Sequence, residues 1–539
     1  MAAIVYQTDK RSGITYAYES HSYWDKEKKQ SRAKRTLIGR VDKTTGEIVP
    51  TDGRGKKRGK KAAEEKGSDK ALPCTEVSRR FCGATALLDA IGKKLGLHDD
   101  LKHCFPKTYQ QMLSIVYYLI LEEHKALFRF EKWHLLHKHP FGKHLSSQRI
   151  SELFASIDET AKEQFFTRWG RHKADKEFWA YDTTSISSYS QTLAQVQYGY
   201  NKEHDPLAQI NLALVFGSQS NLPFHYRKLA GNIPDAATLK HLLKDLERLG
   251  FGKVKLVMDR GFYSEANINA LFHDHRKFLI AAKMSLGFIR KALDPLYASF
   301  RSFEYYIAQY ELYAHTLTVD WDYRHERPYK GDTLEETRRL YVHYYYDIER
   351  AAEEEKTFDN KLSTLRQELL SNKRVKAHEA LYEKYFDIKE TPKRGIHIQV
   401  KEEVVAKTKR YYGFFVLLSN EKMDAVTALQ IYRNKDVVEK AFGNLKERLN
   451  LRRVLVSSQR SLDGKLFVAF IALIYLSYIK KQMQEKELFK TYTIGTLLDT
   501  LDVIECFEAP GSKMRVGEML KKQKEIYADL GVEPPVGSL

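Results

Sequence analysis

The order of hydrophobic and polar positions divides the first third of the chain into two regions. Residues 1–50 contain short β-favouring runs and the turn-rich segment Asp42–Gly46, a pattern typical of β-hairpins. Residues 79–172 place apolar side chains at helical spacing, as Leu87 and Ile91 do, and are predicted to be helical throughout. We therefore expect an N-terminal β-hairpin region followed by a helical region.

From about residue 175 the pattern changes to buried strands that alternate with amphipathic helices. Three strand-like runs come first, followed by a leucine-striped helix, a strand, a second helix and another strand. This is the order expected of a ribonuclease-H-like core, so the fold class is predicted to be α/β. The strands are expected at 178–186, 209–217, 224–229, 253–259 and 277–283, and the helices at 239–249 and 265–275.

The core pattern then stops for a long stretch before it resumes near residue 409. The intervening residues include one strand and a charge-rich helix or helical hairpin, and the simplest account is a β/helical insertion inside the core. A buried strand and a helix then complete the core, and an apolar helix begins a helical C-terminal region. These elements are expected at 339–346, 348–369, 411–418, 435–449 and 465–481.

Charge adds a class of partner to this picture. The chain of 539 residues has a formal net charge of +19, spread along its whole length, which fits a polyanion bound over a large surface. The segment Gly53–Lys61 interleaves six basic residues with three glycines and is expected to be a linker that either follows a phosphate backbone or is simply solvated. A merely soluble basic protein remains the alternative reading of the charge.

Several classes of protein are disfavoured by the composition. Four cysteines are too few for a disulfide framework, and their spacing does not match a zinc site. The N-terminus lacks the apolar run of a signal peptide. The longest apolar stretch, Leu466 to Ile479, has about 14 residues and is too short to span a bilayer, which needs ~20. We therefore expect a soluble intracellular protein that does not enter a membrane.

One helix of the 79–172 region has features of a groove-reading helix. It follows a turn and runs from Leu145 to Leu153, with a serine cap and with Gln148 and Arg149 in its first turn. Polar and basic side chains at this position of a short helix can reach base edges. Many ordinary capped helices have the same pattern, so a purely structural helix remains an alternative.

Two aspartates are placed where an α/β sheet carries its ligand site. Asp182 ends the apolar run Phe178–Tyr181, and Asp259 ends the apolar run that contains Val257 and Met258. Carboxylates at the carboxyl ends of neighbouring strands converge at one edge of an open sheet. An aspartate that ends a strand is also a common turn or cap residue, which is the alternative for either one alone.

A third acid lies on the helix predicted at 435–449. Tyr432, Lys435, Glu439 and Lys446 are spaced so that they stack along one face of a continuous helix. The acid on such a face can hold a cation while the lysines hold phosphates on either side. The alternative is a solvated stripe of Glu–Lys ion pairs.

These residues resemble a family signature. The pattern Tyr-x2-Arg-x3-Glu-x6-Lys marks a large class of bacterial insertion-sequence transposases with an Asp-Asp-Glu catalytic triad. The chain is similar to it at Tyr432, Glu439 and Lys446, with Lys435 in place of the arginine. Asp182 and the Asp259-Arg-Gly-Phe segment resemble the first and second aspartate motifs of the family. Lysine keeps the charge of the arginine but loses its bidentate grip on phosphate.

The resemblance implies a metal-dependent DNA transposase. Asp182, Asp259 and Glu439 would be the catalytic metal ligands for two Mg²⁺ ions, with Mn²⁺ able to substitute. The implied reaction is cleavage at the ends of the insertion sequence, followed by strand transfer of the freed 3′-hydroxyl into target DNA. The implied partners are double-stranded DNA and a second subunit in a synaptic homodimer, in the bacterial cytoplasm on the nucleoid. The expected DNA-binding residues are Tyr432, Arg433, Lys435, Lys446 and Arg149.

Three alternatives to this function stay open, together with the domain boundaries. The first is a structure-specific endonuclease of the same fold that never joins DNA, the second is a non-catalytic DNA-binding relative, and the third is a basic scaffold protein. The expected regions are an N-terminal β region (1–50), a basic linker (51–78), a helical DNA-binding domain (79–172), the first segment of the ribonuclease-H-like core (173–285), the insertion (286–408), the second segment of the core (409–455) and a C-terminal helical region (456–539).

Overall fold

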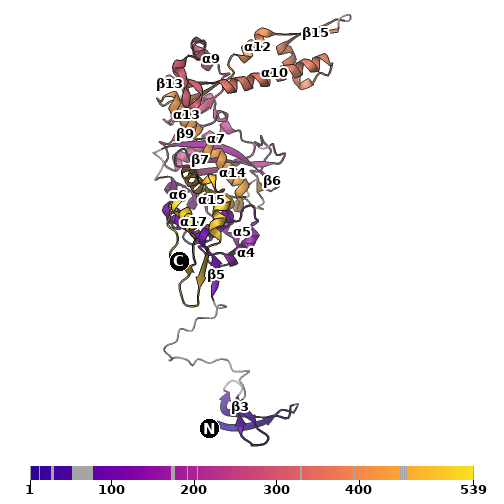
Figure 1. Ribbon diagram of the computed structural model, residues 1–539, viewed down its shortest axis with the longest axis vertical. Helices are drawn as coiled ribbons and strands as arrows, with labels where there is room; N and C mark the ends of the chain where they lie inside the picture. Colours follow the sequence, from indigo (N-terminus) through magenta and orange to yellow (C-terminus); the bar gives the residue numbers. More distant parts are fainter. Residues whose placement is uncertain are drawn as a thin grey trace. The chain divides into compact units, whose positions relative to one another are not determined.

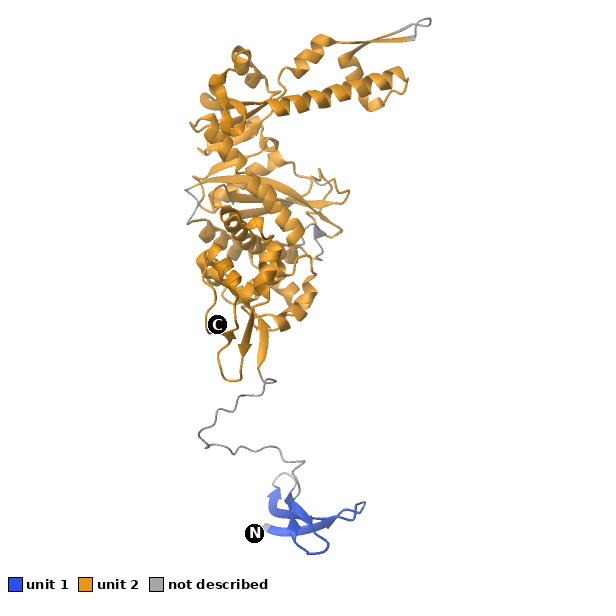
Figure 2. Cartoon of the chain, viewed as in Figure 1, with its two compact units in different colours: residues 1–72 blue, residues 73–539 orange. Residues whose placement is uncertain are grey.

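A computed structural model divides the chain into two compact units, residues 1–72 and 73–539 (Figure 2). The division falls within the predicted basic linker, whose residues 51–76 lie outside the described part of the structure. The structure describes residues 2–10, 12–25, 29–50, 77–171, 177–190, 192–202, 204–327, 331–391, 395–449, 451, 453–454, 456 and 458–537.

The first unit is a four-stranded antiparallel sheet, as the β-hairpin pattern predicted. Its strands are β1 (Ala2–Thr8), β2 (Thr15–Asp25), β3 (Gln30–Val41) and β4 (Ile48–Val49), in the order β1-β2-β3-β4. The Asp42 side chain accepts hydrogen bonds from the backbone N–H groups of Thr44 and Thr45, and Gly46 supplies the positive φ that closes the turn. Most of β3 is exposed.

In the second unit, helices from the N-terminal and C-terminal segments of its sequence pack together. Helix α15 (Gln459–Glu485) packs against α3 (Tyr109–Leu121) and α5 (Ser147–Ser156), and strand β18 (Glu505–Glu508) pairs with β5 (Ser78–Phe81). The predicted regions 79–172 and 456–539 therefore share one hydrophobic core. The remaining elements are α1 (Gly83–Lys94), α2 (Leu97–Cys104), α4 (Phe130–Leu136), α6 (Glu159–Arg171), α16 (Ile494–Asp502), β19 (Arg515–Val516) and α17 (Lys521–Asp529).

Helix α15 extends beyond both ends of the helix predicted at 465–481. Within the described residues it is the one helix that is long and apolar enough to cross a membrane, with 27 residues and a mean hydropathy of 1.7 in its most apolar window. Of that window, 89% is buried inside the protein. The apolar stretch from Leu466 to Ile479 lies inside this helix, with Lys465 and Lys480 directly flanking it. A Cβ on Gly464 would meet the Phe154 carbonyl oxygen at 2.0 Å, so glycine is what allows α15 to approach α5.

A ten-stranded sheet forms the centre of the second unit (Figure 1). Its path is β11-β12-β13-β16-β10-β9-β6-β7-β8, with β17 pairing β6 beside that path. Strands β6, β9 and β10 are parallel, whereas β7 and β8 continue antiparallel from β6. The predicted α/β class and the predicted order of elements are confirmed for this part of the chain. The elements are β6 (Phe178–Ser188), β7 (Gln209–Gly217), β8 (Pro223–Ala230), α7 (Asp235–Arg248), β9 (Lys255–Met258), α8 (Glu265–His273) and β10 (Phe278–Ala282).

The segment predicted as an insertion contributes strands to this central sheet. Strands β12 (Leu312–Arg327) and β13 (Asp332–Asp347) form a long hairpin, and β13 pairs with β16 (Phe414–Ser419). The sequence predicted only part of β13 and missed β12, although Leu317, Val319, Trp321 and Tyr323 alternate there with polar residues. The short strands β11 (Tyr306–Ile307) and β17 (Arg453–Val454) and helix α9 (Gly287–Leu293) were not predicted.

A separate small core follows the hairpin. Helix α10 (Ile348–Leu370) matches the predicted charge-rich helix and buries Phe358, Leu365 and Leu369. These side chains pack with residues of the elements that follow, so this part of the chain has a hydrophobic cluster of its own. The following elements are α11 (Glu379–Tyr385), β14 (Phe386–Thr391), β15 (Gly395–Val400) and α12 (Glu402–Lys409).

The helix predicted at 435–449 is present, but it changes from α-helical to π-helical geometry after Gly443. Helix α13 (Ala425–Arg433) ends before it, α14 (Asp436–Gly443) forms its first half, and a π-helical turn, η8 (Asn444–Arg448), forms the rest. A turn at Asn434 and Lys435 separates Tyr432 from α14, and the wider π turn changes the direction of the side chains after Gly443, so the predicted face is not that of one uniform α-helix.

Candidate active site

The two predicted aspartates lie at the same level of the sheet, but only Asp259 ends its strand as expected, because β6 continues past Asp182 to Ser188. Strands β6 and β9 are parallel neighbours, and their register pairs Tyr181 with Met258. Asp182 directly follows Tyr181, and Asp259 directly follows Met258. Neighbouring strands lie ~4.8 Å apart, so the two aspartates are close to each other. Each carboxylate accepts a hydrogen bond of 2.7 Å from the backbone N–H of the residue that follows it. The sheet therefore brings the two carboxylates together, as the sequence predicted.

Tyr432 fixes the second aspartate from helix α13. Its hydroxyl donates a hydrogen bond of 2.8 Å to Asp259 Oδ1. Burial alone would raise the pKa of Asp259, but this bond and the one from the Arg260 N–H outweigh burial, and the pKa is lowered. Asp259 is therefore held as a carboxylate. The tyrosine was expected to bind DNA, and the structure shows that it also orients an acid.

Lys435 is a buried cation among the three acids. Its side chain is only 3% exposed, and its Nζ donates a hydrogen bond of 3.0 Å to Glu439 Oε1. Burial alone would lower the pKa of Lys435, but the carboxylates of Asp182, Glu439 and Asp259 outweigh burial and raise it. One positive charge therefore faces all three predicted catalytic acids.

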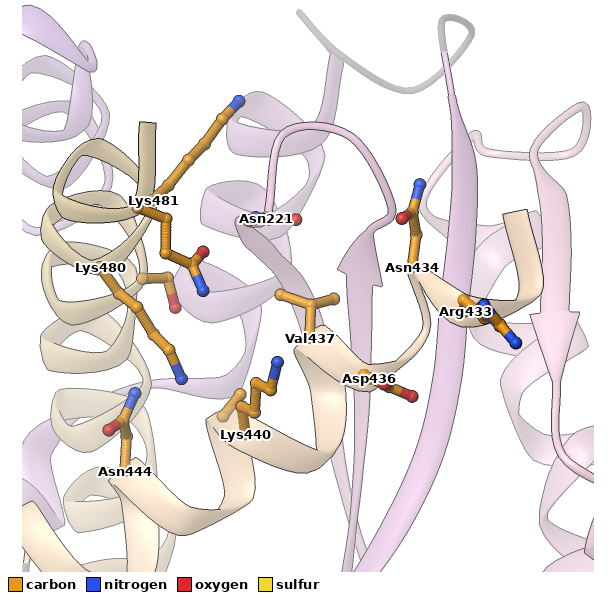
Figure 3. Close-up of a pocket in the computed structure, with 12 residues that line it drawn as sticks. Asn221, Arg433, Asn434, Asp436, Val437, Lys440, Asn444, Lys480 and Lys481 are labelled. Atoms are coloured by element: carbon orange, nitrogen blue, oxygen red, sulfur yellow. The ribbon is translucent and has the colours of Figure 1, made fainter. Parts of the chain in front are cut away.

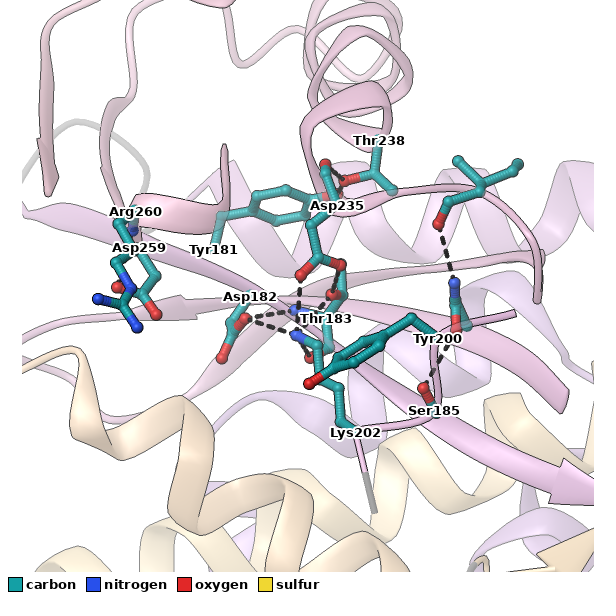
Figure 4. Close-up of polar contacts among 12 residues, drawn as sticks. Tyr181, Asp182, Thr183, Ser185, Tyr200, Lys202, Asp235, Thr238, Asp259 and Arg260 are labelled. Carbon is teal, nitrogen blue, oxygen red and sulfur yellow. Dashed lines mark hydrogen bonds and ion pairs between the residues drawn. The ribbon is translucent and has the colours of Figure 1, made fainter. Parts of the chain in front are cut away.

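A second polar network surrounds Asp182 (Figure 4). Lys202 Nζ lies 3.5 Å from Asp182 Oδ1 and 3.1 Å from Asp235 Oδ2, and it donates a hydrogen bond of 2.7 Å to the Thr183 carbonyl. The Thr183 hydroxyl donates to Asp235. Burial raises the pKa of Asp182, and the charges of Lys202 and Lys435 offset only part of that increase.

Lys202 and Asp235 were not predicted as site residues. Asp235 is the first residue of helix α7, where an acidic residue is common and by itself indicates no function. Lys202 lies in the segment between β6 and β7, where a single lysine among polar residues gives no periodic signal. Its role follows only from its position beside Asp182.

The three carboxylates of Asp182, Asp259 and Glu439 are the kind of ligand that a hard divalent cation prefers, but the Glu439 side chain is paired with Lys435. In the part of the chain that the structure describes, no three His, Cys, Asp or Glu side chains form a group that could hold a metal ion as they lie. Asp182 and Asp259 are in place, whereas the Glu439 side chain is 59% exposed and turned to Lys435. Carboxylate oxygens are the ligands that Mg²⁺ prefers. In this structure the ammonium group of Lys435 faces the three carboxylates.

The other predicted DNA-binding residues lie outside this cluster. Lys446 is in the π-helical turn and only 9% exposed. Arg433 is at the end of α13, with its guanidinium 4.5 Å from the centre of the Tyr310 ring. Arg149 follows Ser146, which caps α5 as predicted by accepting a hydrogen bond from the Arg149 N–H, and its side chain is 75% exposed. The structure brings Tyr432 and Lys435 to the acids and leaves Arg433 and Arg149 apart from them.

The opposite pKa shifts of the two aspartates predict opposite effects on stability. The raised pKa of Asp182 means that its ionised form costs stability at neutral pH, and this cost disappears as the pH falls through its folded value. The lowered pKa of Asp259 means that it contributes stability above its unfolded pKa of ~3.9, which is lost as the pH falls through its folded value.

Amide substitutions measure this difference in metal-free protein. We expect Asp182→Asn to unfold in urea with a free energy no lower than that of the wild type at neutral pH. We expect Asp259→Asn to lose roughly 1–2 kcal/mol, the usual contribution of hydrogen bonds to a charged group. The two variants should converge as the pH falls below about 4, where both native carboxylates gain protons. Equal losses for both variants at neutral pH would contradict these assignments.

Comparison with known proteins gives a family match over the region that contains the site. The family model described as "Transposase DDE domain" matches residues 173–475, which is more than half of the chain and includes all three predicted acids. No curated protein matches the chain. Among solved structures, the chain is similar to a piggyBac transposase in a synaptic complex with hairpin DNA, with 10% sequence identity, a TM-score of 0.30, and coverage of 77% of this chain and 70% of that one. A likeness of this size carries no information on residue roles.

Proposed function

The chain belongs to the transposases with a DDE domain, and from this we propose that it cleaves DNA at the ends of an insertion sequence and joins the freed 3′-hydroxyl to target DNA. The observation that carries the proposal is the convergence of Asp182 and Asp259 on adjacent parallel strands, beside a buried lysine that also pairs with Glu439. We further propose that Tyr432, Lys435, Glu439 and Lys446 form a variant of the Tyr-Arg-Glu-Lys signature of bacterial enzymes, in a ribonuclease-H-like core.

We assign the three acids to metal binding. Asp182, Asp259 and Glu439 would hold two Mg²⁺ ions, with Mn²⁺ able to substitute. When bound, such ions activate the attacking oxygen and stabilise the leaving oxygen of an in-line phosphoryl transfer. Tyr432 keeps Asp259 ionised and oriented through its 2.8 Å hydrogen bond, and backbone N–H groups hold both aspartates in place. The protein thus presents preorganised charge to the reacting phosphate.

Lys435 and Lys202 have different tasks in this proposal. Lys435 neutralises the three acids and pairs with Glu439 in the metal-free protein. With Glu439 holding a metal ion, its ammonium group would be available to a phosphate oxygen of the DNA, in the place of the arginine of the signature. Lys202 and Asp235 hold Asp182 at its place on β6, so they are positioning residues.

A joining assay tests this function. The purified protein is mixed with Mg²⁺, a supercoiled plasmid and a labelled duplex that carries an end of its own element. We expect label in the plasmid, which requires both cleavage and strand transfer, and no label when EDTA replaces Mg²⁺. Cleaved ends without joined product would identify an endonuclease of the same fold, and binding without cleavage would identify a non-catalytic relative. A dimeric complex on paired ends would support the proposed synaptic homodimer.

A recognition role for Arg149 gives a separate prediction. Its side chain is exposed in the first turn of α5, where it can reach a base edge. We expect Arg149→Ala to reduce the preference for the element's end over scrambled DNA by about 1–3 kcal/mol, as for loss of a bidentate contact to guanine. Competition binding with the two duplexes measures this difference. A uniform loss of affinity for both DNAs would make Arg149 a phosphate contact.

A further inference from the structure

A second polar site lies in a pocket of about 170 Å³ between α14, the helix that carries Glu439, and α15. The pocket exceeds the ~30 Å³ that one water occupies in the liquid, so it has room for a larger polar group. Helix α14 and the turn after it contribute Lys440 and Asn444, and α15 contributes Lys480, Lys481 and Gln484. Asn221, from the turn between β7 and β8, closes one side. None of these residues belongs to the cluster of acids.

The side chains of Lys440 and Lys480 point into the space between the two helices, whereas that of Lys481 extends away from it (Figure 3). Figure 3 shows Lys440, Lys480 and Asn444 directed into that space, whereas the acid among the lining residues, Asp436, points away from it. Among the described residues, neither Lys440 nor Lys480 has a carboxylate partner. Lys481 is held by the Gln219 carbonyl at 2.9 Å and lies 3.7 Å from Glu485.

The charged form of Lys480 is disfavoured by its surroundings when no ligand is bound. Burial lowers its pKa, and the nearby positive charges of Lys440 and Arg448 lower it further. A half-buried ammonium without a carboxylate costs free energy of folding. A position that costs stability and has no carboxylate partner among the described residues is typical of a binding site.

We propose that this pocket binds a backbone phosphate of DNA, outside the catalytic centre. Ammonium groups supply the charge, and the amide groups of Asn444, Gln484 and Asn221 supply further hydrogen-bond donors for phosphate oxygens. Lys440 directly follows Glu439, so the two side chains point about 100° apart around α14. The phosphate bound here is therefore a different one from the phosphate that reacts at the acids. This assignment rests on the proposed function, because it takes DNA as the polyanion.

The substitutions Lys440→Gln and Lys480→Met, singly and together, test the pocket in the full chain. Binding to a duplex of arbitrary sequence is measured in EDTA at several salt concentrations. We expect the double variant to bind more weakly and its log–log salt slope to fall by ~0.9, the value for one lost phosphate contact. Lys490→Gln is the control, because Lys490 is 73% exposed and paired with Glu487 outside the pocket. The control should bind as the wild type does.

Two further measurements separate a phosphate site from a structural role. The melting temperature of Lys480→Met should equal or exceed that of the wild type, because the substitution removes an unpaired buried charge. Ethylation of individual phosphates should reveal at least one position that impairs binding of the wild type and no longer affects the double variant. A lower melting temperature combined with an unchanged ethylation pattern would make the lysines structural and overturn the proposal.

The behaviour of the wild type separates failure of the pocket proposal from failure of the proposed function. Unchanged affinity and salt slope in the double variant, with a wild type that binds and cleaves DNA, would overturn only the pocket. A wild type that neither binds nor cleaves DNA would overturn the function itself. Stabilisation by orthophosphate that is lost in the double variant, with an unchanged ethylation pattern on DNA, would identify a site for a free anion and would also overturn the DNA assignment.

Discussion

Replacing any one of the three acids by its amide is expected to reduce DNA cleavage by at least ~10³-fold while binding in EDTA stays close to that of the wild type. The variants are Asp182→Asn, Asp259→Asn and Glu439→Gln. Each keeps the shape of the side chain and removes one negative charge from the proposed metal site. Loss of one group that stabilises transition-state charge costs on the order of 10²–10³-fold, and loss of a metal ligand removes more than one such interaction.

The measurement is the rate of cleavage of a labelled end at saturating protein, with the affinity determined separately by titration in EDTA. Asp322→Asn is a matched control, because Asp322 is an exposed carboxylate on β12. It should cleave at the wild-type rate. The expected stability of Asp182→Asn makes that variant the most informative, since its inactivity could not come from unfolding. A rate within tenfold of the wild type for any of the three would remove that residue from the catalytic set.

The second large effect is expected from Lys435→Met. The substitution keeps an apolar chain of similar length but removes the cation that faces all three acids. Breaking a buried ion pair by removing one partner typically costs about 3–5 kcal/mol, because the remaining charges stay buried and uncompensated. We expect a loss of this size in the free energy of unfolding in EDTA at neutral pH. The wild-type contribution is fully present there, since the raised pKa of Lys435 means that it is lost only above ~10.4.

Mg²⁺ should restore part of this stability. Without the ammonium group, the carboxylates of Asp182, Asp259 and Glu439 compensate their charge by binding a divalent cation, and a ligand at 100 times its Kd adds about 2.7 kcal/mol. Urea unfolding in EDTA and in excess Mg²⁺ measures both effects. Lys435→Arg is the control: it keeps the charge, carries the residue of the family signature, and should remain close to the wild type in EDTA. An unfolding midpoint for Lys435→Met that equals the wild type in EDTA would show that Lys435 does not hold the acids together.

The sequence by itself determined the local elements and the identity of the acids. Apolar runs that lead into Asp182 and Asp259 identify strands and place a carboxylate on each, because burial and the change to polar residues are both visible over a few positions. The leucine stripe of α7 and the serine cap of α5 are local in the same sense. These signals were sufficient to predict the α/β class and to single out Asp182 and Asp259, whereas Glu439 was singled out by its spacing from Tyr432, Lys435 and Lys446.

Only the tertiary structure decided which of these residues meet. The register that sets Asp182 beside Asp259 depends on pairing between strands far apart in the sequence, and no local pattern specifies it. The burial of Lys435 and the approach of Lys202 to Asp182 depend on how α14 and the β6–β7 segment pack against the sheet. The break between α13 and α14 was also invisible, because Asn434 and the π turn have no strong helix-breaking residue. Charge environment and packing arise from the whole fold, so the positioning lysines could be assigned only after the strands and helices were in place.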